Sequence, residues 1–127
     1  MVRALHPRTI EVTTEAHLTE RGDCIIGVEA DKGCSGLDPK FREALRTPGS
    51  RVSFRILVGG EEFRLSGRGN PELTTSDPRE MVIRKTGFVS ARTVAVGADK
   101  AACDLPRSMV ARLTRPETRG WLEMEVA

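Results

Sequence analysis

The chain has 127 residues, of which 39% are hydrophobic and 30% charged, and its 20 basic and 18 acidic side chains leave a net charge of +2. This composition is typical of one soluble globular domain and excludes a disordered, fibrous or membrane-embedded chain. No apolar run reaches the roughly 20 residues that a membrane span needs, and the N-terminus lacks the apolar core of a secretory signal. We therefore expect a single domain over residues 1–127, located in the cytoplasm.

The cysteines and histidines exclude several kinds of site. Cys24, Cys34 and Cys103 are odd in number and form no C-x-x-C pair, which argues against a secreted disulfide scaffold and against a cysteine-rich zinc site. The sequence holds only two histidines, so a histidine-rich metal site is excluded as well. We expect reduced thiols, no metal and no cofactor, and leave open whether Cys34 and Cys103 ever pair.

The first half of the chain predicts strands around one helix. Thr9–Thr13 alternates polar and apolar residues, and the apolar run 24–28 is rich in β-branched residues, so both predict strands. Asp38 followed by Pro39 is typical of a helix start, and an apolar stripe of helical period continues to Leu45. Residues 52–58 then alternate as a half-buried strand does.

A tight hairpin follows at Gly59-Gly60, because a two-residue glycine loop fixes the register of the strands that it joins. With Val58 opposite Glu61, that register predicts two apolar pairs on one face, Ile56 with Phe63 and Phe54 with Leu65. It also places Arg55 opposite Arg64.

The second half predicts the same kinds of element after a loop over residues 67–78. Residues 77–80 resemble a capping box and predict one helical turn, and strands are expected at 81–84 and 92–96. Leu105, Met109 and Leu113 form an apolar stripe with Asp104 near the helix cap, and residues 122–126 alternate as a closing strand.

The chain also repeats itself at an offset of 68 positions. Residues 25–58 align without a gap on residues 93–126, with identities at Val28, Ala30, Asp31, Lys32, Leu37, Leu45, Pro48, Arg51 and Val58. We infer an α+β protein with duplicated strand–helix–strand halves, over about 9–66 and 77–127. The two helices are expected to pack on a mainly antiparallel or mixed sheet, in a ferredoxin-like arrangement with extra strands.

The repeated Asp–Lys loops are candidate ligand-binding residues. Asp31-Lys32 and Asp99-Lys100 each follow a predicted strand and precede a helix, where loop amides and a lysine favour an anion and an aspartate orients it or binds a metal. The alternative, which we favour, is that each pair fixes the loop of its own repeat.

The arginines give further candidates. Arg55 opposite Arg64 is unfavourable unless an anion lies nearby, and that anion is either a phosphate ligand or, as we favour, Glu123 with Glu125 on an adjacent last strand. Two other segments are candidates for binding an anion: the glycine-containing loop with Arg68 and Asn70, and the cations Arg84, Lys85 and Arg92 around Phe88.

The segments Leu18–Val28, Met81–Lys85 and Ala98–Ala102, with Arg92-Thr93, resemble a family of small archaeal proteins classed as a domain of unknown function. The resemblance covers the chain from about His6 onward, and His6-Pro7-Arg8-Thr9-Ile10-Glu11 is similar to the family's early segment. It implies an archaeal, intracellular protein and implies no activity.

Three functional hypotheses follow. The first is a binding module for an anionic partner, either RNA or a phosphorylated small molecule, although a net charge of +2 counts against a dedicated nucleic-acid binder. The second is a small enzyme with a pocket formed by the two Asp–Lys loops. The third is a structural or assembly subunit that forms a homodimer through an uncovered sheet edge or face.

Overall fold

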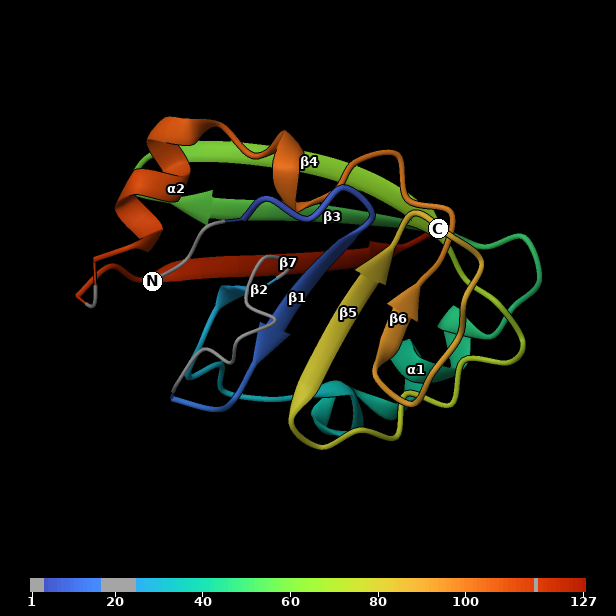
Figure 1. Ribbon diagram of the computed structural model, residues 1–127. Helices are drawn as coiled ribbons and strands as arrows, with labels where there is room; N and C mark the ends of the chain where they lie inside the picture. Colours follow the sequence, from blue (N-terminus) through green and yellow to red (C-terminus); the bar gives the residue numbers. More distant parts are fainter. Residues whose placement is uncertain (1–3, 17–24, 116) are drawn as a thin grey trace.

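A computed structural model describes residues 4–16, 25–115 and 117–127 (Figure 1). Two ends of predicted elements, Cys24 and Pro116, lie outside these residues. None of the helices formed by the described residues is both long and apolar enough to cross a membrane.

Seven strands divide between two sheets. The four-stranded sheet has the order β2-β1-β5-β6 and contains β1 (Thr9–Thr13), β2 (Ile25–Gly27), β5 (Glu80–Arg84) and β6 (Thr93–Ala95). Its central pair β1–β5 is antiparallel, and both outer pairs are parallel. The three-stranded sheet is antiparallel, with the order β4-β3-β7, and contains β3 (Arg51–Val58), β4 (Glu61–Arg68) and β7 (Gly120–Val126).

The two α-helices are short. In α1 (Pro39–Leu45) the Asp38 carboxylate accepts a hydrogen bond from the Lys40 amide at 2.8 Å, which confirms the predicted cap. The helix α2 (Arg107–Leu113) begins after Pro106 without a side-chain cap. Asp104 instead caps the preceding 3-10 helix η3 (Ala102–Asp104); a similar turn, η2 (Cys34–Gly36), precedes α1.

The α+β class is confirmed, but the helices do not cover a single sheet. Inward-facing side chains of β3, such as Phe54 and Ile56, share one hydrophobic cluster with Ile10, Ile83 and Val94 of the other sheet. The helices lie toward opposite ends of the molecule in Figure 1. Helices of seven residues are too short to cover a sheet, so each sheet buries its apolar face against the other. A ferredoxin-like arrangement is not confirmed.

The predicted hairpin before the loop is confirmed, whereas the predicted helical turn at the end of the loop is not. The hairpin register is confirmed, including Val58 opposite Glu61 and Arg55 opposite Arg64, and β4 continues two residues beyond its expected end. The helical turn expected at residues 77–80 is wrong. The Asp77 carboxylate accepts from the amides of the next two non-proline residues, at 2.8 and 2.9 Å, in a turn that leads directly into β5.

Elements recur at the offset found in the sequence. Adding 68 to the bounds of β2, η2 and α1 gives the bounds of β6, η3 and α2, and the same offset takes residues 52–58 of β3 onto β7. Among the described residues β4 has no counterpart after β7. A common origin of the two halves stays a prediction.

Within the described part of the chain, backbone hydrogen bonds join the two sheets along one side only. Backbone hydrogen bonds between Arg68 and Val96, at 2.7 and 3.0 Å, connect the end of β4 to the residue that follows β6. On the opposite side, β2 and β7 are the edge strands, and no bridge between them is formed by the described residues.

Candidate functional site

The second Asp–Lys loop is held on the outer edge of β4. The Asp99 carboxylate accepts a hydrogen bond from the Ser66 amide at 2.9 Å, and the Lys100 ammonium donates to the Arg64 carbonyl at 2.8 Å. The same ammonium lies 5.1 Å from the centre of the Phe63 ring. Both side chains therefore hold this loop against β4.

The first Asp–Lys loop lies elsewhere, beside β7. Asp31 and Lys32 are exposed and line a cleft of about 910 Å³ between residues 28–32 and residues 117–122. Asp99 and Lys100 line a different, shallower groove of about 730 Å³. The structure thus does not bring the four residues into one pocket, as the enzyme hypothesis required.

The shallower groove runs over the exposed face of the three-stranded sheet. We call this surface the arginine–serine face. It presents three cross-strand pairs of β3 and β4, of which every residue except Arg68 lines the groove: Arg51 with Arg68, Ser53 with Ser66, and Arg55 with Arg64.

One arginine pair on this face is neutralised within the chain. The Arg55 guanidinium contacts Glu123 of β7 and Glu62 of β4, the latter at 3.1 Å, and Arg64 donates to Glu62 at 2.6 Å. The hydrogen bond with Glu123 raises the pKa of Arg55, and the hydrogen bond from Arg64 lowers the pKa of Glu62. The prediction that Glu123 offsets these charges is confirmed, but Glu125, which was predicted with it, forms no ion pair among the described residues. The role of Glu62 was not predicted from the sequence.

The other arginine pair has no such neutralisation. Arg51 exchanges backbone hydrogen bonds with Ala127, so its pairing with Arg68 is the closely spaced kind, with Cα atoms about 4.5 Å apart. Neither guanidinium has an acidic partner within 4.0 Å among the described residues. Asp99 and Glu125 flank the groove, and Asp99 is already bound to Ser66. An anion beside Arg51 and Arg68 would relieve their repulsion.

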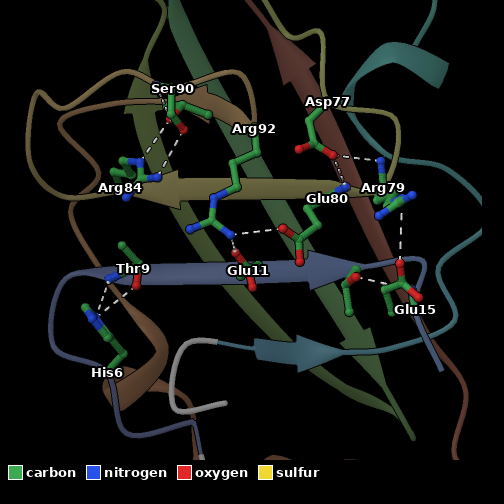
Figure 2. Close-up of polar contacts among 12 residues, drawn as sticks. His6, Thr9, Glu11, Glu15, Asp77, Arg79, Glu80, Arg84, Ser90 and Arg92 are labelled. Carbon is green, nitrogen blue, oxygen red and sulfur yellow. Dashed lines mark hydrogen bonds and ion pairs between the residues drawn. The ribbon is translucent and has the colours of Figure 1, made fainter. Parts of the chain in front are cut away.

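Two of the remaining predicted cations, Arg84 and Arg92, contact side chains of the four-stranded sheet (Figure 2). Arg92 reaches across β5 and donates from one nitrogen to Glu11 at 2.8 Å and to Glu80 at 2.9 Å. Arg84 donates to Thr93 at 2.9 Å and lies 4.8 Å from the centre of the Phe88 ring. These two predicted residues therefore lie close together, in a cluster separate from the arginine–serine face.

Lys85 and Asn70 have local structural contacts. The Lys85 ammonium lies 3.8 Å from the Asp104 carboxylate, and the Asn70 side chain accepts from the Glu72 amide at 2.8 Å. The Asn70 amide in turn donates to the Leu45 carbonyl at 2.9 Å, which ties the loop after β4 to the end of α1.

Glu11 is the most deeply buried acidic side chain of this region, with 5% of it exposed. Burial raises the pKa of its carboxyl, and Arg92 opposes that rise. The same early segment carries His6, whose Nδ1 accepts from the Thr9 amide at 3.1 Å. The segment 6–11 entered the sequence resemblance, but nothing in it indicated that Glu11 would pair with a residue 81 positions away.

The thiols and acidic groups define no metal centre. Cys34 and Cys103 are both free; Cys34 is buried, and burial raises its pKa to about 12. Within the described part of the chain, no three histidine, cysteine or acidic side chains gather in a group that could hold a metal ion.

These features define a small α+β protein with two sheets, in which arginines make most of the described ion pairs. The chain belongs to the family described as a domain of unknown function, DUF371, which matches residues 1–127. It is similar to an uncharacterised protein of the archaeon Methanocaldococcus jannaschii, with 38% identity over 112 residues that cover 88% of this chain and 82% of that protein. The archaeal family inferred from the sequence is thereby confirmed, and neither description assigns an activity.

Proposed function

We propose that the arginine–serine face binds an anionic ligand through a phosphate group. The observation that carries the proposal is the close pairing of Arg51 with Arg68, which lacks the acidic partners that Arg55 and Arg64 have. Guanidinium groups bind phosphate through paired, charge-assisted hydrogen bonds, and such groups bind more tightly than neutral donors.

Neighbouring side chains support the same chemistry. The hydroxyls of Ser53 and Ser66 lie one row further along the sheet, and Lys100 lines the same groove. The groove is open and shallow, which suits a phosphate held at its surface better than an enclosed substrate. Because the net charge is only +2, a phosphorylated small molecule is favoured over a long stretch of RNA backbone.

Isothermal titration calorimetry of the full chain at low salt tests the proposal. The ligands are inorganic phosphate, pyrophosphate, a nucleoside diphosphate and a mixed-sequence RNA, so the arms separate small phosphorylated molecules from nucleic acid. We expect saturable binding of the small ligands that weakens as salt is added.

Substitutions identify the site. Arg51→Gln and Arg68→Gln should each weaken binding roughly tenfold, because each removes one charged hydrogen-bond donor. Arg115→Gln, a change of the same kind at an exposed arginine outside the groove, should leave the affinity unchanged. Binding that the substitutions at Arg51 and Arg68 leave intact would refute the site, and no binding of any ligand would refute the function.

A further inference from the structure

The two outer edges of the three-stranded sheet differ. Along β4, residues 96–100 follow the edge and bind it through the backbone and through Asp99 and Lys100. The residues 68 positions earlier, 28–32, follow β2 in the same way, but the strand beside them is β7, and a cleft separates the two. Figure 1 shows the corresponding arrangement, with β4 and β7 on opposite sides of β3.

The internal repeat indicates what would fit into this cleft. The offset relates β3 to β7 and β6 to β2, so the place occupied by β4 beside β3 corresponds to a place beside β7. Among the described residues no strand lies there. The cleft of about 910 Å³ therefore stands where one further strand would complete the sheet and close the second side of the molecule.

The backbone of β7 is oriented to accept such a strand. Arg51 and Ala127 exchange backbone hydrogen bonds, so the main-chain groups of Ala127 point toward β3. Because main-chain groups point to alternate sides along an antiparallel strand, the odd-numbered residues of β7 also bind β3. The amides and carbonyls of Gly120, Leu122 and Met124 therefore point to the cleft side. An edge with unpaired main-chain groups is a template for another extended chain.

The side chains of the cleft are apolar at its base and only half covered. Leu122 and Met124 of β7 are partly buried. Phe63 and Leu65 lie on the same face of the sheet in the other edge strand, β4, and are only 7% and 4% exposed. Further apolar lining comes from the facing sheet and loop: Val12, Val28, Leu37 and Met81. Large apolar side chains on an added strand would fill this space as Phe63 and Leu65 fill the other side.

The rim of the cleft carries Asp31 and Lys32, which correspond in the repeat to the two residues that bind β4. Asp31 and Lys32 are exposed and have no partner among the described residues, whereas Asp99 and Lys100 bind a main-chain amide and a main-chain carbonyl of β4. On the exposed face of β7, Glu123 is already paired with Arg55, whereas Glu125 has no side-chain partner among the described residues. A basic side chain on the exposed face of an added strand would complement Glu125.

We propose that this cleft binds one extended segment of another polypeptide, which adds to the free edge of β7 as an antiparallel strand. The segment has large apolar side chains at alternate positions, facing Leu122 and Met124, and a basic side chain on its exposed face, opposite Glu125. Asp31 accepts a main-chain amide of the segment and Lys32 donates to a main-chain carbonyl. Recognition is thus by strand addition, with main-chain bonds giving affinity and alternate pockets giving specificity.

The chain supplies its own probe. A synthetic peptide with the sequence of residues 61–68 and the change Glu62→Lys has Phe63 and Leu65 at alternate positions and, in the register that β4 has with β3, a basic side chain opposite Glu125. Trp121, the single tryptophan, lines the rim of the cleft and is 61% exposed, so its fluorescence reports occupancy. Titrating the full chain with this peptide should give a saturable shift of the emission to shorter wavelength. A control peptide that differs only by proline in place of its central leucine should give no shift, because proline cannot donate to the strand ladder.

Matched variants test whether Asp31 and Lys32 contact the bound peptide. Asp31→Ala and Lys32→Ala should each weaken peptide binding about fivefold, the equivalent of one hydrogen bond, whereas Lys40→Ala on the exposed side of α1 should not. Absence of binding, or binding that the proline peptide reproduces, would overturn the proposal. So would a stable dimer, seen by sedimentation, whose Trp121 emission is already shifted and does not respond to peptide, because the occupant would then be a second copy of the chain.

Discussion

The buried carboxylate of Glu11 makes the stability of the protein depend on Arg92. Removing Arg92 by substitution with alanine leaves Glu11, 5% exposed, with Glu80 as its acidic neighbour and without the guanidinium 2.8 Å away. Removing one member of a fully buried ion pair costs about 3–5 kcal/mol, but the Arg92 side chain is 41% exposed and water would partly replace it.

Protonation sets an upper bound on the cost. If Glu11 becomes neutral at pH 7 in the variant, the cost relative to its ordinary pKa of 4.5 is 2.5 pH units, about 3.4 kcal/mol. We therefore expect Arg92→Ala to lower the free energy of unfolding by between about 1 and 3.4 kcal/mol at pH 7. Urea unfolding followed by circular dichroism measures this difference.

The dependence on pH has a definite sign. Because the folded protein raises the pKa of Glu11, the carboxyl holds its proton more tightly when folded than when unfolded. Its contribution to stability is present below the unfolded pKa of about 4.5 and is lost as the pH rises through the folded pKa. The deficit of Arg92→Ala should accordingly shrink as the pH falls from 7 toward 4.5.

A double-mutant cycle isolates the charge. In a Glu11→Gln background the amide needs no counter-ion, so Arg92→Ala should cost much less at pH 7 than it does in the native sequence. If Arg92→Ala costs the same at both pH values and in both backgrounds, then Arg92 acts through packing, and the electrostatic reasoning is wrong.

Three simpler predictions follow from single positions. Cys103 should react with a thiol reagent in the folded protein while Cys34 reacts only on unfolding, because Cys34 is buried and its pKa is raised to about 12. Gly69→Ala should destabilise by about 1–3 kcal/mol in urea unfolding, because a Cβ atom there would lie 2.3 Å from the carbonyl oxygen of Leu45. Asp38→Ala should cost about 1 kcal/mol in the same assay through loss of the α1 cap, and Asp38→Asn much less.

Local patterns were sufficient to predict the hairpin of β3 and β4. The glycines at 59 and 60 have positive φ values of 54° and 86°, which a two-residue turn requires, and the alternation of the strands agrees with the same register. The repeat added one long-range fact, that Glu123 would correspond to Arg55, and these residues are indeed paired. Sequence reasoning succeeded where two independent patterns agreed.

Long-range pairing was beyond those patterns. Nothing within residues 9–13 indicates that they pair with residues 80–84, so the division into two sheets and the pairing of Glu11 with Arg92 were not predicted. At Asp77 the error has a chemical reason. A helix cap and an Asx turn both use an aspartate oxygen to accept amides two and three residues ahead, so the sequence signal is the same for both.

The two Asp–Lys loops now allow a comparison that sequence identity alone could not make. Asp31 and Asp99 occupy the same place in the repeat, yet among the described residues only Asp99 binds a strand, through the Ser66 amide at 2.9 Å. We expect Asp99→Ala to lower the free energy of unfolding by about 1 kcal/mol and Asp31→Ala to leave it unchanged.

This pair separates stability from binding. If the loops were fixed by their own turns, as the repeat alone suggests, the two substitutions would cost the same. A measurable loss at both positions in urea unfolding would therefore contradict the assignment of Asp31 to an intermolecular role. A loss at Asp99 alone is the result expected if the loop acts through the strand beside it, with that strand at Asp31 supplied by the proposed partner.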